Sequence, residues 1–175
     1  ASVAPLIVAA QACAADTRRN GGPFLTFTDR EGADFDAFAA RIIPTDDTPG
    51  AREAGAVYFA DQALGTFMAD LLLPMRDGFG RLAERSASGD DQPFPDLPDE
   101  RQDELIGAIE REDPQFFFVA RALVVMGLLS NPELGGNRDG LGWQLIGFED
   151  RFAYQPPFGF YDRNEHGPAG AMGGA

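Results

Sequence analysis

Residues 113–129, DPQFFFVARALVVMGLL, decide the fold expected of this 175-residue chain. Asp113 can cap a helix and Pro114 can occupy its first turn, where the N–H that proline lacks has no intrahelical partner. From Phe116 to Leu129 the run is apolar except for Arg121 and Gly127. It is shorter than the roughly 20 residues that a membrane-spanning helix needs. A helix that is apolar on nearly every side belongs in a core, so we expect a central helix surrounded by the others.

Two helices are expected in the first third of the chain. The first carries an apolar stripe at helical spacing, formed by Phe35, Phe38, Ala39, Ile42 and Ile43. Pro44 should end it. Thr48 is then predicted to cap a second helix and Pro49 to be its first residue. That helix carries Ala54, Val57 and Tyr58.

Two more helical regions are expected between that helix and residue 113. The first covers 67–82, and Pro74 should kink or split it because proline removes a backbone donor. Residues 86–98 are polar and rich in proline, which predicts a loop. Residues 99–113 have helical composition, and their predicted buried side carries Leu105, Ile106 and Ile109.

The two ends of the chain differ from this middle. Residues 1–28 are expected to be an apolar arm and linker, and the stretch 16–32 has turn residues typical of an exposed link. Residues 151–175 are rich in proline and glycine, so we expect an extended tail that packs no core of its own. No alternating strand pattern is present. We therefore predict an all-α chain of about five helices, with its helical domain at 29–150.

The charge and the rare residues exclude several functions. The formal net charge is −14, and every basic residue is an arginine. Such a chain repels nucleic acid and anionic membrane, because phosphate binding needs a clustered positive surface. With Cys13 as the one cysteine and His166 as the one histidine, no internal disulfide, Cys/His zinc site or haem-attachment motif can be written. No cofactor or metal is expected in this chain.

The apolar stretch ASVAPLIVAAQACAA, residues 1–15, has two interpretations. It resembles the end of an export signal, in which a hydrophobic region precedes small residues. It is equally consistent with an apolar arm that packs on a partner. Both interpretations stay open at this point.

The polar loop at residues 131–142 is the densest candidate for chemistry. It lacks the strand, the glycine spacing and the lysine that phosphate-binding loops use, and it lacks the ligand spacing of a calcium-binding EF-hand. We therefore interpret it as a glycine-rich turn that sets Trp143 and Phe148 against the helices. Asn137 should satisfy backbone groups there, so Asn137→Ala is expected to destabilise the chain.

Asp46 and Asp47 invite comparison with the paired carboxylates of glycosidases. Adjacent carboxylates between a helix end and a helix start are more often turn formers. His166, with Asp162 and Glu165 nearby in the tail, lacks the rigid setting that a catalytic base needs. No catalytic residue is expected.

Two blocks of the sequence resemble the gluconate 2-dehydrogenase subunit 3 family. Residues 41–51, RIIPTDDTPGA, followed by Ala54 and Gly55, look like its first motif. Phe116, Phe117, Gly127 and the stretch 131–148 resemble its second block, although Leu134 stands where a tyrosine is expected. The run 155–162, QPPFGFYD, is similar to its tail. The residues that these motifs single out, and for which a structural role is expected, are Arg41, Pro44, Asp46, Asp47, Pro49, Gly50 and Gly55 in the first block and Gly135, Gly136, Asn137, Gly142, Trp143 and Gly147 in the second.

The resemblance implies a non-catalytic small (gamma) subunit of a periplasmic sugar or sugar-acid dehydrogenase. The partner it implies is an FAD-containing large subunit of the glucose-methanol-choline type, in some complexes joined by a multihaem cytochrome c. Small subunits of this kind carry a twin-arginine (Tat) export signal and assist folding and export of the flavoprotein. Association with the inner membrane would then come through the complex.

Two alternatives stay open. One is an independent helical enzyme with an acidic, metal-assisted site around Asp46, Asp47 and residues 137–139. The other is a periplasmic chaperone that leaves its client after folding.

Overall fold

The computed structural model describes residues 22–151 and 153. Within them every regular secondary-structure element is a helix, which confirms the predicted all-α fold class. The helices are α2 (Asp29–Ile42), α3 (Ala56–Gly65), α4 (Leu72–Asp90), α5 (Asp99–Glu112), α6 (Pro114–Leu129) and α7 (Leu141–Leu145). Short 3-10 turns connect them: η1 (Ala69–Leu71), η2 (Phe94–Asp96), η3 (Pro132–Leu134) and η4 (Arg138–Gly140). Most of the expected arm and tail, including Cys13 and His166, lies outside the described residues.

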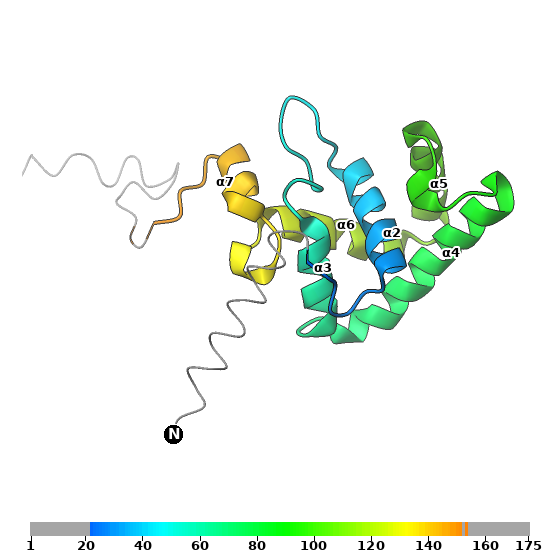
Figure 1. The fold of residues 1–175 in the computed structure, drawn as a ribbon, viewed down its shortest axis with the longest axis horizontal. Helices are drawn as coiled ribbons and strands as arrows, with labels where there is room; N and C mark the ends of the chain where they lie inside the picture. The colour runs from blue at the N-terminus through cyan, green and yellow to red at the C-terminus, as the bar shows by residue number, and fades with distance from the viewer. Residues whose placement is uncertain (1–21, 152, 154–175) are drawn as a thin grey trace, which may run out of the picture.

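Helix α6 is the centre of the packing. It contacts α2, α3, α4, α5 and α7, and its contact with α3 is the most extensive (Figure 1). As the sequence predicts, Pro114 occupies its first turn and the Asp113 carboxylate accepts a hydrogen bond from the Phe116 N–H at 3.1 Å. The phenyl ring of Phe116 packs edge-on against Phe79 of α4, with 5.1 Å between the ring centroids. Such contacts, repeated between Phe79 and Phe38 of α2, join three helices into one aromatic core.

The predicted central position of α6 among the other helices is confirmed, but one side of the helix is only partly covered. Phe118 is 68% exposed, and three more apolar residues on the same face of the helix are only partly buried: Ala122, Val125 and Leu129. These four residues follow the i, i+4, i+7, i+11 spacing of one helix face. The neighbouring helices leave this face only partly covered, and Phe118 is its one exposed apolar residue among the four. We call these four residues the outer α6 face.

The second helix begins later than predicted. Thr48 does not cap it, because its N–H and hydroxyl donate to the Asp46 carboxylate at 2.8 and 2.9 Å. The segment after Pro49 forms turns, and α3 starts only after Gly55, whose φ of 69° is a left-handed conformation that glycine adopts without strain. The local cap-and-proline pattern was therefore overridden by a hydrogen-bonded turn.

Pro74 neither kinks nor splits a helix. It lies in the first turn of α4, where its missing N–H has no intrahelical partner, and α4 continues unbroken to Asp90. The loop predicted at 86–98 is consequently shorter and begins at Asp91. Phe94, inside that loop, is fully buried.

The segment before α2 is not the exposed link that the sequence suggested. Thr28 and Glu31 form a reciprocal capping box, so α2 begins at Asp29 within the predicted link. Phe24 and Phe27 pack against the core. The chain between them is held to α3 by a buried acidic side chain, described below.

Candidate functional site

Residues 44–48 of the first motif block form an exposed loop that projects from the helical body between α2 and α3 (Figure 1), whereas Gly50, Ala51, Ala54 and Gly55 are buried. The carboxylates of the block build turns: Asp46 accepts from Thr48, and Glu53 accepts from the Gly50 N–H at 3.0 Å. Hydrogen bonds from the backbone and hydroxyl of Thr48 lower the pKa of Asp46. A low pKa suits a hydrogen-bond acceptor and not a general acid.

Arg41 of the same block acts elsewhere. Its guanidinium donates from Nε and Nη2 to the two carboxylate oxygens of Asp103, both at 2.7 Å, and Nη1 lies 2.5 Å from Asp99. The hydrogen bond from Arg41 holds the pKa of Asp103 below its usual value. Arg41 therefore ties α2 to α5, away from the turn in which its motif lies.

The second block packs by close backbone approach. A Cβ on Gly136 would overlap the carbonyl oxygen of Gly127, and a Cβ on Gly142 would overlap that of Leu128. Gly135, with a φ of 96°, lies against the backbone of Tyr58. These glycines let the loop after α6 lie directly on α3 and on the end of α6.

Asn137 holds this loop together from a fully buried position. Its Nδ2 donates to the Ser130 carbonyl at 2.8 Å, and its Oδ1 accepts from the Gly142 N–H at 2.8 Å. Its own N–H donates to the Gly127 carbonyl at 2.7 Å. Both ends of the amide are thus used for backbone groups, as its predicted structural role requires.

Trp143, in the middle of α7, connects that helix to the end of α6. Its indole N–H donates to the Leu129 carbonyl at 2.9 Å, and its ring packs against Phe148 with 5.2 Å between centroids. Gly147, with a φ of 66°, forms the turn between the two rings. The interpretation that the loop sets these aromatics against the helices holds for Trp143, whereas Phe148 is 43% exposed.

The two motif blocks meet in space. The Arg138 N–H donates to the Ala54 carbonyl at 2.9 Å, and its guanidinium lies beside Gly55. Blocks that are about 80 residues apart in the chain thereby form one junction between α3, the end of α6 and the loop that leads into α7.

The family model of gluconate 2-dehydrogenase subunit 3 matches residues 29–150, which cover this whole junction. The chain belongs to that family. No curated protein and no solved structure matches it significantly. The family is named for a subunit of a dehydrogenase complex, so the chain is a complex subunit with partner chains.

The structural roles of two residues of this subunit were not predicted from the sequence. Asp61 lies in the middle of α3 and is fully buried; its Oδ1 accepts the N–H groups of Thr26 and Phe27 at 2.8 Å, and its Oδ2 accepts that of Leu25 at 2.9 Å. One signal was available, because an aspartate interrupts the apolar face of AVYFADQAL at 56–64. The other residue is Arg138, whose partial burial no local pattern reveals.

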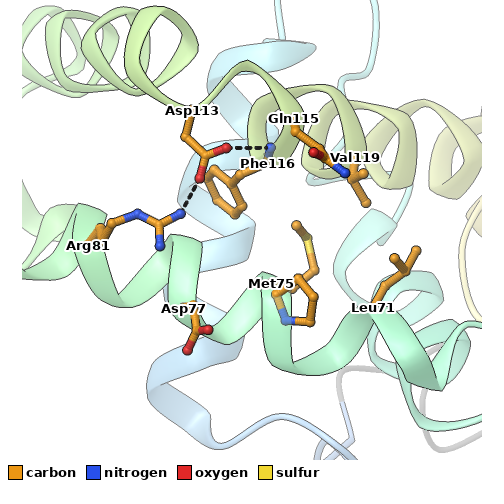
Figure 2. A pocket seen from close by; sticks show the side chains of 9 residues that line it. Leu71, Met75, Asp77, Arg81, Asp113, Gln115, Phe116 and Val119 are labelled. Carbon is orange, nitrogen blue, oxygen red and sulfur yellow. Dashed lines mark hydrogen bonds and ion pairs between the residues drawn. The ribbon is translucent and has the colours of Figure 1, made fainter.

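A recess of about 370 Å³ opens between α4 and α6 (Figure 2). Its apolar wall includes Leu71, Met75, Phe116 and Val119. At one end the Arg81 guanidinium is paired with the Asp113 carboxylate, which also caps α6 (Figure 2). Arg81 and Asp113 neutralise each other, and the polar side chains of Asp77 and Gln115 also line the recess, which therefore offers an apolar wall with a polar rim. Val119 neighbours Phe118 in the chain, and the recess therefore adjoins the outer α6 face.

Within the described part of the chain no group of three or more His, Cys, Asp or Glu side chains is placed to hold a metal ion. None of the described helices is long and apolar enough to cross a membrane.

Asp34 is a buried carboxyl group whose ionisation should make the stability of the folded chain depend on pH. It is 5% exposed, and its Oδ1 has no hydrogen-bond partner among the described residues, while Arg30 donates to Oδ2 at 3.0 Å. Burial raises its pKa above the ordinary 3.8, and Arg30 opposes this only in part. Ionising Asp34 is therefore harder in the folded chain than in the unfolded one.

The stability of wild type relative to Asp34→Asn should accordingly fall as the pH rises from about 3.8 through the raised pKa. Below that window both chains carry a neutral side chain at position 34, and above it only wild type carries the desolvated charge. Urea unfolding of both proteins between pH 3.5 and 7 tests this. A difference that is constant with pH, or that grows in favour of wild type, would contradict the raised pKa.

Proposed function

We propose that this chain is a non-catalytic accessory subunit that binds, stabilises and helps to export the FAD-bearing large subunit of a sugar, sugar-acid or polyol dehydrogenase. Membership in a family named for a dehydrogenase subunit supports a role inside such a complex. Asp46, Arg41 and Asn137 of the two motif blocks are engaged in turns, ion pairs and backbone hydrogen bonds, which fits a scaffold better than a reaction centre.

The observation that carries the proposal is the outer α6 face. Helix α6 is apolar on nearly every side, yet Phe118 is 68% exposed. The short helix α7 packs against α6. Its last residue, Leu145, and Ile146 and Phe148 in the turn that follows are 39%, 62% and 43% exposed. Exposed apolar side chains gathered on neighbouring helices mark protein–protein contact surfaces. The recess between α4 and α6 extends this surface and offers a pocket for an anchoring side chain.

The remaining elements of the proposal follow from the family resemblance. The partner is a flavoprotein of the glucose-methanol-choline type, in some complexes accompanied by a multihaem cytochrome c. The complex works in the periplasm, reached by Tat export, and is held at the inner membrane through its other chains. No described residue of this chain is proposed to bind FAD or haem.

Purification of the native complex tests the proposal. A tagged subunit should co-purify with a roughly equimolar, yellow, flavin-containing chain that reduces a dye in the presence of a sugar or sugar acid. Recovery of the subunit without any flavin-containing chain, from cells that also produce the large subunit, would contradict the proposal.

A matched pair of variants places the contact surface. Phe118→Ser should weaken the complex by about 10-fold or more, because a large apolar side chain in an interface contributes more than 1 kcal/mol when it is a hot spot. Leu73→Ser on α4 is the control, since Leu73 is also 68% exposed but lies outside the outer α6 face. Equal affinities of the two variants for the flavoprotein would exclude the outer α6 face as the contact.

A further inference from the structure

Arg138 is an unmatched charge in a chain with 28 acidic and 14 basic residues. Most arginines of the described region form ion pairs with aspartate or glutamate, whereas Arg111, Arg121 and Arg138 form none with described residues. Arg111 and Arg121 are exposed, so water solvates them. Arg138 is partly buried, and its Nε is shielded from solvent without a described hydrogen-bond partner. A shielded guanidinium N–H with no acceptor is costly.

The backbone holds this guanidinium in a fixed place. The N–H of Arg138 donates to the Ala54 carbonyl at 2.9 Å, and its two neighbours, Asn137 and Asp139, have left-handed φ values of 46° and 55°. The guanidinium carbon lies 6.0 Å from the centre of the Tyr58 ring, a cation–π distance. A side chain at Gly55 would come within 3.3 Å of Nη2, so glycine at this position keeps the space for Arg138.

Arg138 lines an open recess of about 380 Å³ at the junction of the two motif blocks. Phe24, Val57 and Tyr58 form its apolar wall. Arg52 and Asp36 also line it, but they neutralise each other with 2.8 Å between Nε and the carboxylate. Asp29 contributes a further carboxylate to the lining and forms no ion pair with Arg138. The recess therefore combines an apolar wall with a cation that no described acidic group pairs.

We propose that Arg138, backed by Tyr58, is a docking site for one carboxylate, the side chain of an Asp or Glu of the partner subunit. The planar guanidinium donates two parallel hydrogen bonds to a carboxylate, and the apolar wall strengthens that pair by excluding water. The η4 turn, which contains Arg138, runs directly into α7, and residues of α7 and of the turn after it belong to the proposed contact surface. This inference rests on the proposed function and adds the chemistry of one contact.

The test compares Arg138→Gln with Arg111→Gln in the complex with the flavoprotein. Arg111 is an exposed arginine with no described ion pair on α5, which lies at the opposite end of the molecule from α7 (Figure 1). Arg138→Gln should raise the dissociation constant by at least about 30-fold, the loss expected when one member of a buried charge pair is removed. It should also weaken the dependence of affinity on salt, whereas Arg111→Gln should change neither quantity.

Arg138→Lys keeps the positive charge but not the two-pronged geometry, so its affinity should lie between those of wild type and Arg138→Gln. If Arg138→Gln lowers the melting temperature of the free subunit, the affinity of Arg138→Lys for the flavoprotein becomes the test of the site. Wild-type affinity in both variants would overturn the site. A wild-type subunit that captures no flavoprotein would instead overturn the proposed function, and this site with it.

Asp16→Asn distinguishes a partner's carboxylate from the one acidic side chain of residues 1–21. Asp16 is the acidic residue of the segment that precedes the described residues. If the proposal is correct, Asp16→Asn leaves the stability of the free subunit unchanged and leaves the complex intact. If Asp16→Asn and Arg138→Gln lower that stability equally and without adding to each other, the carboxylate belongs to this chain and the proposal is wrong.

Discussion

Replacing Asp61 by alanine should lower the free energy of unfolding by about 3 kcal/mol or more, among the largest effects expected of any single change in this subunit. Asp61 is fully buried, and its two carboxyl oxygens accept the N–H groups of Leu25, Thr26 and Phe27 from a segment more than 30 residues away. Alanine leaves these three N–H donors without partners and leaves a cavity between α3 and residues 25–27. The segment before α2 should then detach, exposing the apolar surface that Phe24 and Phe27 cover.

Asp61→Asn isolates the hydrogen bonds from the cavity. Asparagine has nearly the same shape, but its NH₂ group cannot accept a hydrogen bond, so at least one of the three N–H groups loses its partner. We expect a loss of about 1 to 3 kcal/mol. Thermal and urea unfolding measure both variants, and hydrogen exchange should show faster exchange of the amides of residues 25–27.

Asp70→Asn is the matched control for this experiment. Asp70 is exposed in η1, and the same chemical change there should alter stability by less than about 0.5 kcal/mol. Similar melting temperatures for Asp61→Asn and Asp70→Asn would mean that the bonds between Asp61 and the 25–27 segment contribute little to stability.

Asn137→Ala is the second change expected to have a large effect, a loss of about 2 to 4 kcal/mol. It removes the bonds to the Ser130 carbonyl and the Gly142 N–H, leaving two buried backbone groups without partners. It also places alanine at a φ of 46°, a conformation that asparagine tolerates better. Since this loop carries Arg138 and leads into Trp143, the variant should disturb the whole motif junction.

Asn131→Ala in the same loop serves as its control. Asn131 is exposed, and its side chain accepts one hydrogen bond, from the Glu133 N–H at 3.0 Å, as the cap of η3. Loss of such a cap costs about 1 kcal/mol. If urea unfolding gave Asn137→Ala no larger a loss than Asn131→Ala, burial of the Asn137 amide would not be what stabilises the loop.

The parts of this fold that the sequence predicts well depend on interactions within a few residues. The cap at Asp113, the proline at 114 and the apolar run after them define α6 without reference to any other segment. The buried face of α5, with Leu105, Ile106 and Ile109, follows from helical spacing in the same way. Local patterns failed where two local solutions competed, as at Thr48, which bonds to Asp46 and not to the start of a helix.

The candidate site shows the same division. The two motif blocks and the turn-forming character of Asp46 and Asn137 were predictable from residue type and spacing. That the blocks form one junction was not, because the hydrogen bond from Arg138 to Ala54 joins residues that are 84 positions apart. A bond of that kind depends on the path of every helix between them.

By itself, the sequence determined the helical class, the central apolar helix and the family, since helix periodicity, capping and motif spacing are properties of neighbouring residues. Tertiary structure alone decided which side of α6 stays only partly covered, which acidic residue holds the segment before α2, and which arginine lacks an acidic partner among the described residues. The physical reason is that burial and pairing depend on where distant helices pack. A Phe118 with 68% of its surface exposed and a Phe116 with 4% lie two residues apart in the same apolar run.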